Sequence, residues 1–124
     1  MIVVDASALL EFLLQTPLGT RVEARLFRDQ EEFHSPHLAD VEVTQGLRRL
    51  VRTGEVSPDR AADALADRHP ISISSLARGS CARTPRRAAM YIALAEALDA
   101  PMVTCDAPLS KAPGHRARIE VIAS

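Results

Sequence analysis

Two short apolar runs that each lead to an aspartate constrain this chain more than any other feature. Residues 2–4 read Ile-Val-Val and are followed by Asp5, and "PMVTCD" at residues 101–106 ends on Asp106. Short β-branched runs of this kind predict buried strands. Helix-spaced leucines follow Asp5 at once, and a strand that leads directly into a helix is the unit from which parallel sheets are built. The sequence therefore predicts an α/β fold.

Helical and strand patterns alternate along the rest of the chain. Helical spacing is expected over residues 7–14, 19–30, 36–54, 58–69 and 85–98, and further strands over residues 71–76 and 118–123. Ser35 and Pro36 are expected to be the N-cap and first residue of the third helix, because these residue types favour those positions. Strands separated by helices predict a three-layer α/β/α domain with a central parallel sheet.

Length and composition exclude several classes of protein. The 124 residues are enough for one domain, so residues 1–124 are expected to form a single unit. A formal net charge of -1 points to no particular partner. The opening apolar run contains Asp5 and Glu11 and lacks a basic start, so neither a signal peptide nor a membrane span is expected. A cytoplasmic protein with reduced Cys81 and Cys105 is the expectation.

Three carboxylates are candidates for a common site. Asp5 and Asp106 follow predicted strands, and the carboxyl ends of parallel strands meet where α/β proteins bind ligands. Glu42 borders the apolar stripe of its predicted helix, a position that is costly without a positive partner. Grouped carboxylates repel one another unless a hard cation holds them. Mg2+ or Mn2+ suits oxygen ligands and would activate water against a phosphodiester.

Each of these acids also has a simpler interpretation. Asp5 precedes a helix and is a good N-cap residue, while Asp106 precedes Ala107 and Pro108 and suits a turn. Glu42 is an ordinary, partly exposed helix residue if the apolar stripe is placed slightly wrongly. The residue types alone leave these alternatives open.

Three stretches taken together resemble the PIN-domain ribonucleases, and in particular the VapC toxins of bacterial VapBC toxin-antitoxin pairs. The stretches are "MIVVDASALLEFLL", "FHSPHLADVEVTQGLRRL" and "MYIALAEALDAPMVTCDAPLS". The resemblance implies a single PIN domain and a Mg2+-dependent endoribonuclease that forms a homodimer and is neutralised by a VapB antitoxin. It places the family's acidic ligands on Asp5, Glu42 and Asp106, and its supporting hydroxyl residues on Ser7 and Thr104.

One position departs from this family pattern. Family members usually have an aspartate three residues before the tyrosine of "YIALAEAL", and here that position is Ala88. Glu96 lies eight residues further along the same helix, about 12 Å away, so it is too distant to substitute. Metal binding is therefore predicted to be weak, and activity low or absent. The alternative is a degenerate PIN domain that binds antitoxin or RNA without cutting.

The residues before this position fit the family poorly. "ARGSCART" at residues 77–84 has neither helical nor strand spacing. One choice of codons for it, read two bases later, encodes Ala-Trp-Glu-Leu-Arg-Ala-Asn, which resembles the helix that the family has there. Residues 71–88 would then be translated out of frame through paired indels, natural divergence being the alternative, and the DNA sequence distinguishes the two.

A phosphoacceptor domain of the receiver type also carries acids at strand ends. Such a domain needs a lysine after a later strand, and Lys111 is the only lysine in the chain. This hypothesis therefore ranks below the nuclease and the binding domain.

Overall fold

The computed structural model describes residues 1–36, 38–67, 72–74 and 86–123. These residues form a five-stranded sheet with strand order β3-β2-β1-β4-β5, in which every neighbouring pair is parallel. The strands are β1 (Ile2–Val4), β2 (Phe33–Pro36), β3 (Ser72–Ser74), β4 (Met102–Thr104) and β5 (Ile119–Val121). The helices are α1 (Ala6–Leu13), α2 (Pro17–Leu26), α3 (Leu38–Arg52), α4 (Pro58–Asp67) and α5 (Arg86–Leu98), with a 3-10 turn η1 (Ala107–Lys111).

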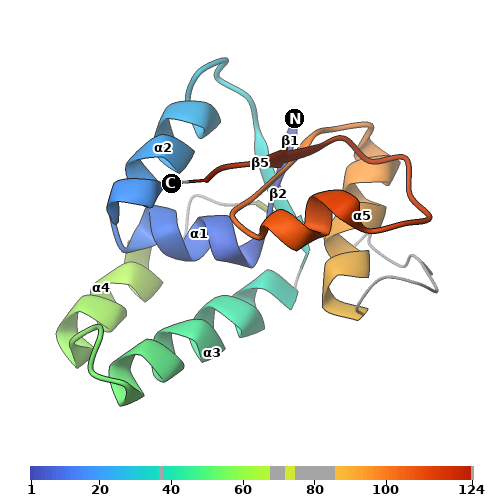
Figure 1. Ribbon diagram of the computed structural model, residues 1–124. Helices are drawn as coiled ribbons and strands as arrows, with labels where there is room; N and C mark the ends of the chain where they lie inside the picture. Colours follow the sequence, from blue (N-terminus) through green and yellow to red (C-terminus); the bar gives the residue numbers. More distant parts are fainter. Residues whose placement is uncertain (37, 68–71, 75–85, 124) are drawn as a thin grey trace.

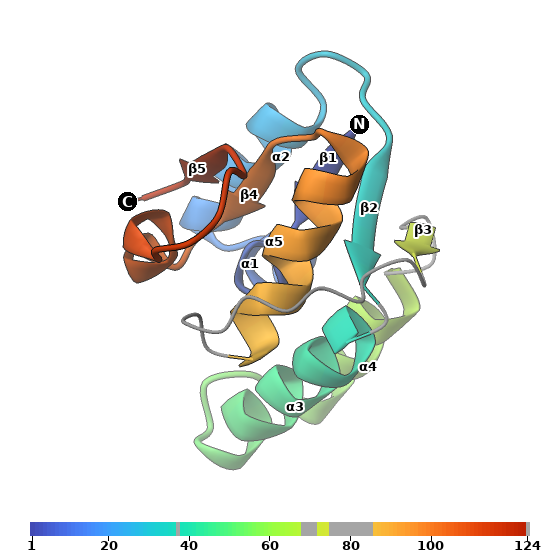
Figure 2. The same cartoon turned by 90° about the vertical axis from the view of Figure 1, so that its right-hand side faces the viewer.

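The sheet lies between helices on both faces, as predicted. Figure 1 shows α1 and α2 on one side of the strands and α5 on the other, and Figure 2 shows α5 in front of β1, with β2 to the right of the helix. Helices α3 and α4 pack against each other and against α1. The three-layer α/β/α arrangement with a central parallel sheet is therefore confirmed.

The core is centred on β1 and β4, which pair with each other in the middle of the sheet. Val4 pairs with Val103, and both side chains are completely buried. Tyr91, Ile92 and Leu94 of α5 are also completely or almost completely buried. Strands with apolar residues at every position are typical of parallel sheets covered on both faces, which explains why both runs lack a polar alternation.

The expected start of the third helix is wrong. Residues 33–36 form the strand β2, which pairs with β1 through Ile2 and Phe33, and the described helix begins at Leu38. Ser35 is not an N-cap: its hydroxyl donates to the carbonyl oxygen of Val4 at 2.8 Å. Neighbouring strands on both sides provide the pairing that the local residues do not favour.

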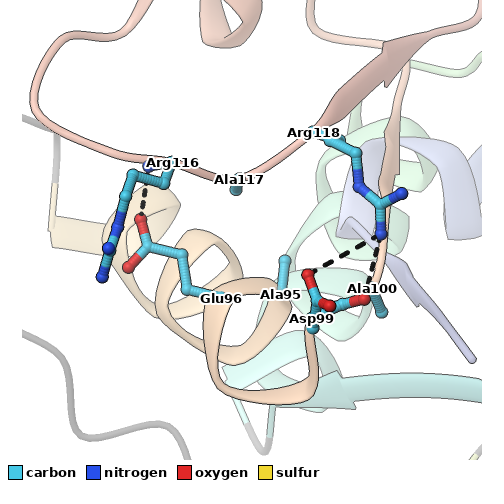
Figure 3. Close-up of a pocket in the computed structure, with 7 residues that line it drawn as sticks. All are labelled: Ala95, Glu96, Asp99, Ala100, Arg116, Ala117 and Arg118. Atoms are coloured by element: carbon cyan, nitrogen blue, oxygen red, sulfur yellow. Dashed lines mark hydrogen bonds and ion pairs between the residues drawn. The ribbon is translucent and has the colours of Figure 1, made fainter.

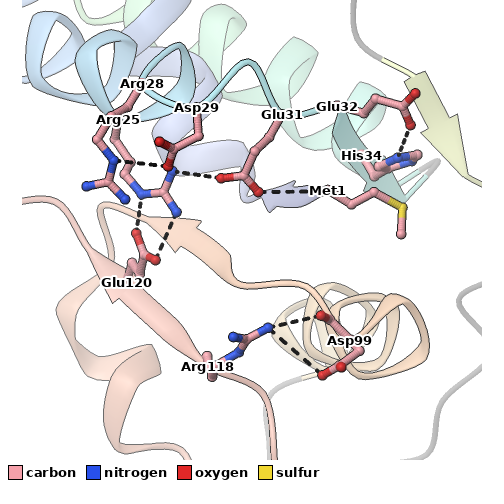
Figure 4. A network of polar contacts seen from close by, with 10 residues as sticks. All are labelled: Met1, Arg25, Arg28, Asp29, Glu31, Glu32, His34, Asp99, Arg118 and Glu120. Atoms are coloured by element: carbon pink, nitrogen blue, oxygen red, sulfur yellow. Dashed lines mark hydrogen bonds and ion pairs between the residues drawn. The ribbon is translucent and has the colours of Figure 1, made fainter.

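A polar network connects α2 to the last strand (Figure 4). Arg25 is a buried residue of α2, and its guanidinium binds both carboxylate oxygens of Glu120 on β5, with Nη2 at 2.9 Å from Oε1. Glu31 bridges the same guanidinium and the amino group of Met1, each at 3.4 Å. The hydrogen bond from Arg25 and the positive charge of its guanidinium lower the pKa of Glu120 below its ordinary value, against the opposing effect of burial.

The lowered pKa predicts an acid-dependent loss of stability. An ionised Glu120 stabilises the fold above its unfolded-state pKa, and this contribution disappears as the pH falls through the lower folded-state value. Because the carboxylate is partly solvent-exposed, the contribution is about 1 kcal/mol. Urea unfolding at several pH values should show the Glu120→Gln protein losing about this amount at neutral pH and nothing in strong acid. An equal loss at both pH values would contradict the assignment.

Candidate active site

Asp5 is held at the junction between β1 and α1. Its Oδ1 accepts the backbone N–H of Ala6 at 2.8 Å, so Asp5 is the N-cap of α1. Its Oδ2 accepts hydroxyl hydrogen bonds from Ser7 and Thr104, both at 2.7 Å. The carboxylate is buried, with 7% of the residue exposed. Asp5 thus caps α1 through one oxygen. The two hydroxyl donors hold its other oxygen, which the cap does not need, and so fix the orientation of the whole carboxylate.

The two hydroxyls also join the end of β4 to the start of α1. Ser7 Oγ accepts the backbone N–H of Cys105 at 3.0 Å, and Thr104 Oγ1 accepts that of Asp106 at 3.0 Å. The two hydroxyl oxygens lie 3.2 Å apart. Ser7 and Thr104 therefore make the contacts with Asp5 that an orienting role requires, while their effect on a reaction stays a prediction.

Glu42 projects from α3 and is held by Tyr91 of α5. The tyrosine hydroxyl donates to Glu42 Oε1 at 2.9 Å, and Tyr91 is 1% exposed. Burial, followed by the charges of Glu42 and Asp5, raises the pKa of Tyr91 far above its ordinary value. The phenol is therefore a neutral donor at physiological pH. In the sequence, Tyr91 marks the motif "YIALAEAL" but carries no sign of its contact with Glu42.

Asp106 lies at the same edge of the sheet as Asp5. It stands two residues after the end of β4, whose Val103 pairs with Val4, whereas Asp5 directly follows β1, so both aspartates lie just beyond the carboxyl ends of neighbouring parallel strands. Asp106 is exposed and stands before η1, but its side chain makes no capping hydrogen bond to that turn. The structure places this carboxylate toward solvent rather than in a turn-stabilising contact.

Ala88 lies on α5 one turn before Tyr91 and is 8% exposed. Residues three apart on a helix share a face, so Ala88 and Tyr91 are neighbours on the buried side of α5. Glu96 cannot take the place of an acid here, because its Oε1 accepts the backbone N–H of Arg116 at 2.9 Å, near the other end of the helix. Of the residues suspected of a frame error, 71 and 75–85 lie outside the described ones.

The side chains at this edge have the donor chemistry that magnesium requires. Carboxylate oxygens are its usual protein ligands, and Asp5 uses three of about four acceptor positions in the hydrogen bonds above. Within the described ranges, however, no group of three or more His, Cys, Asp or Glu side chains is placed to hold a metal ion. Ligation by Asp5, Glu42 and Asp106 together thus stays a prediction, and the acid absent at position 88 is the ligand that would complete a set.

Cys105 lies beside this group but is not a nucleophile. Burial, with smaller effects from the charges of Glu11 and Asp5, raises the pKa of its thiol to about 11. The reactive form of a cysteine is the thiolate, so Cys105 is inert at physiological pH. Cys81 lies outside the described residues.

A hollow lies at the end of the strands opposite to Asp5 and Asp106 (Figure 3). It has a volume of about 260 Å³ and is lined by the end of α5 and by residues 116–118. Ala100 precedes β4 and Arg118 precedes β5, so this hollow is at the amino ends of the strands. Arg118 donates to the carbonyl oxygen of Asp99 at 3.0 Å. The hollow is therefore separate from the edge of the sheet where Asp5 and Asp106 lie.

No helix among the residues that the structure describes is long and apolar enough to cross a membrane.

Comparison with known proteins agrees with this arrangement. The PIN domain family matches residues 2–114 of the chain. Ribonuclease VapC12 of Mycobacterium tuberculosis is 36% identical over 132 residues, covering 99% of this chain and 100% of that protein. Ribonuclease VapC1 of the same organism is 33% identical, covering 97% and 96%, and Ribonuclease VapC9 is 40% identical over 119 residues, covering 89% of each chain.

The family match covers the strands β1, β2 and β4 and the helix α5, which together position the carboxylate edge. The relatives extend over almost the whole length of the chain at more than 30% identity. The chain therefore belongs to the PIN-domain family and, within it, to the VapC ribonucleases.

Proposed function

We propose that this protein is a toxin of the VapC type: a Mg2+-dependent endoribonuclease that cleaves RNA phosphodiester bonds and is neutralised by a VapB-like antitoxin. The observation that carries the proposal is the Asp5 carboxylate, buried after β1 in a PIN fold and held by the hydroxyls of Ser7 and Thr104. The names of the relatives support the reaction class. Mn2+ is expected to substitute for Mg2+.

The roles of the side chains follow from their positions. Asp5, Glu42 and Asp106 would hold the ion, which when bound supplies a Lewis acid for the attacking water and the leaving oxygen. The Ser7 and Thr104 hydroxyls would keep the Asp5 carboxylate in one orientation, so that it need not reorganise during the reaction. Asp106, being exposed, is the carboxylate nearest to arriving RNA.

Ala88 favours a second candidate function. A buried methyl group occupies the position where the resemblance implies an acidic ligand. The chain as it stands would then cleave RNA slowly or not at all, and would act by binding antitoxin or RNA. An RNA substrate, a VapB-like antitoxin, a homodimer and a cytoplasmic location are common to both candidates and are proposed on the family resemblance alone.

Replacement of Asp5 tests the nuclease proposal directly. The purified chain, incubated with total bacterial RNA, should produce fragments slowly in Mg2+ and none in EDTA. Asp5→Asn keeps the shape and the capping oxygen but removes the charge, and is expected to lower the residual rate at least about 100-fold. Ser57→Ala is a matched control, because the Ser57 side chain also accepts a backbone N–H at a helix start but stands before α4, a different helix.

The outcomes separate the two candidates. Cleavage that survives EDTA, or that is unchanged in the Asp5→Asn protein, would contradict the nuclease proposal. Retention of RNA on the chain without any fragment in Mg2+ or Mn2+ would support the binding function instead.

A further inference from the structure

Tyr91 connects two helices through a buried hydrogen bond to an ionisable side chain. Its hydroxyl on α5 donates to Glu42 Oε1 on α3 at 2.9 Å, and only 1% of Tyr91 is exposed. Water therefore has little access to compete for the phenol. A hydrogen bond from a buried donor to a carboxylate is stronger and more directional than one at the surface. The bond restricts where the Glu42 carboxylate can lie.

The same hydroxyl is close to Asp5. The charges of Glu42 and Asp5 both raise the pKa of Tyr91, whereas the backbone amide of Ala6 acts on the phenol in the opposite direction. The phenol thus experiences the charge of a carboxylate that follows β1 as well as the charge of its hydrogen-bond partner on α3.

We propose that Tyr91 is a positioning residue, whose hydroxyl holds the Glu42 carboxylate beside Asp5 so that both acids face the same divalent ion. This inference rests on the proposed function and goes beyond it, because Tyr91 touches neither RNA nor metal and acts only through Glu42. Two like charges repel, and a hydrogen bond from a neutral donor to one of them offsets part of that repulsion before an ion arrives. Ala88, where the family resemblance implies an acid, lies on the same face of α5 as Tyr91, one turn away. The hydrogen bond from the phenol is thus a contact that restricts the orientation of Glu42 in this chain.

Removal of the hydroxyl in a metal-binding background tests the proposal. Mn2+ alone is the probe, titrated into the Ala88→Asp protein and into the Ala88→Asp/Tyr91→Phe protein by isothermal calorimetry. Loss of a hydrogen bond that orients a ligand should weaken Mn2+ binding about 10- to 100-fold. For RNA cleavage, kcat should fall by a similar factor while KM for RNA stays the same, because the phenol does not contact the substrate.

Ile92→Val is the matched control. Ile92 is the next residue of α5 and equally buried, but it has no polar atom to contribute. This change perturbs the core of the same helix, and Mn2+ affinity should stay within about 2-fold of the Ala88→Asp protein. A similar weakening by Ile92→Val and Tyr91→Phe would assign Tyr91 a packing role and overturn the proposal.

The natural chain offers a second readout, since Tyr91 is its only tyrosine and it has no tryptophan. Its near-ultraviolet fluorescence reports on this phenol alone. Glu42→Gln replaces a charged acceptor by a neutral one and should increase the emission, whereas Asp40→Asn on the same helix should not. An emission unchanged by Glu42→Gln would overturn the contact.

The failures are distinguishable. If the Ala88→Asp protein binds no Mn2+, the proposed metal site fails and the positioning role fails with it. If that protein binds Mn2+ and the Tyr91→Phe change leaves affinity and kcat unaltered, the positioning role alone is overturned.

Discussion

Replacement of Ala88 by aspartate should raise the rate of Mg2+-dependent RNA cleavage by at least about 100-fold. Removing a residue that only hydrogen-bonds a metal ligand lowers metal affinity or activity by up to about 100-fold, and a direct ligand contributes no less. Ala88 is on the face of α5 that carries Tyr91, and Tyr91 bonds Glu42, so a carboxylate at position 88 would stand on the helix face that contacts Glu42. Fragment production from a labelled RNA, and growth arrest on induction, measure the gain.

The same replacement should make the stability of the folded protein depend on Mg2+. Position 88 is 8% exposed, so an unpaired carboxylate there is expected to lower the free energy of unfolding by about 1–3 kcal/mol. A ligand that binds only the folded state restores stability in proportion to its concentration. Thermal melts should therefore show a lower Tm for Ala88→Asp in EDTA and a marked rise in millimolar Mg2+, while the natural chain responds little.

Ala88→Asn is the matched control for both measurements. It adds a side chain of the same size without the charge, so it should carry the stability cost in EDTA but gain neither cleavage nor the Mg2+ response. If Ala88→Asp stays inactive and its Tm is insensitive to Mg2+, the missing acid is not what limits this chain.

Gly19→Ala should destabilise the fold by about 3 kcal/mol and lower Tm by about 10 °C. In most helices this change stabilises, because alanine has the higher helix propensity. In α2, however, a Cβ on Gly19 would stand 2.0 Å from the carbonyl oxygen of Glu11 and 2.6 Å from its carbonyl carbon. Both atoms belong to the backbone of α1, so neither can move without shifting a helix.

Gly46→Ala separates a backbone clash from the loss of a glycine in general. Gly46 is buried in α3, and its Cβ would meet Leu10 Cδ1 at 2.6 Å, the end of a side chain that can change rotamer. The gain in helix propensity offsets that adjustment, and Tm should change by only a few degrees. Equal losses for the two variants, measured by thermal unfolding, would contradict the close approach of α1 and α2.

The two strands at the centre of the sheet could be predicted from the sequence, and β2 could not. β1 and β4 consist of fully buried residues that are all apolar except Thr104, so their local pattern and their tertiary environment agree. The residues of β2 are Phe-His-Ser-Pro, which have no alternation and contain helix-start residues. Their strand conformation depends on pairing with β1 and β3, and pairing between distant segments is not encoded in the spacing of one segment.

The candidate site divides in the same way. Asp5 and Asp106 could be placed at one edge because a residue that follows a parallel strand has a known position in the sheet. The hydrogen bond from Tyr91 to Glu42 could not be predicted, because it requires the relative orientation of α3 and α5. A lone tyrosine in an alanine-rich helix was the only signal, and it is equally typical of a core residue.

The order of the strands also determines when the site can form during synthesis. β1 is made first, yet it is completed on one side by β4, and Asp5 receives a hydroxyl from Thr104, 99 residues later in the chain. Contacts between such distant segments form slowly and only after both exist. A nascent chain therefore lacks the Thr104 hydrogen bond to Asp5 until β4 has been translated. Until then Asp5 has only its local donors, the backbone N–H of Ala6 and the hydroxyl of Ser7.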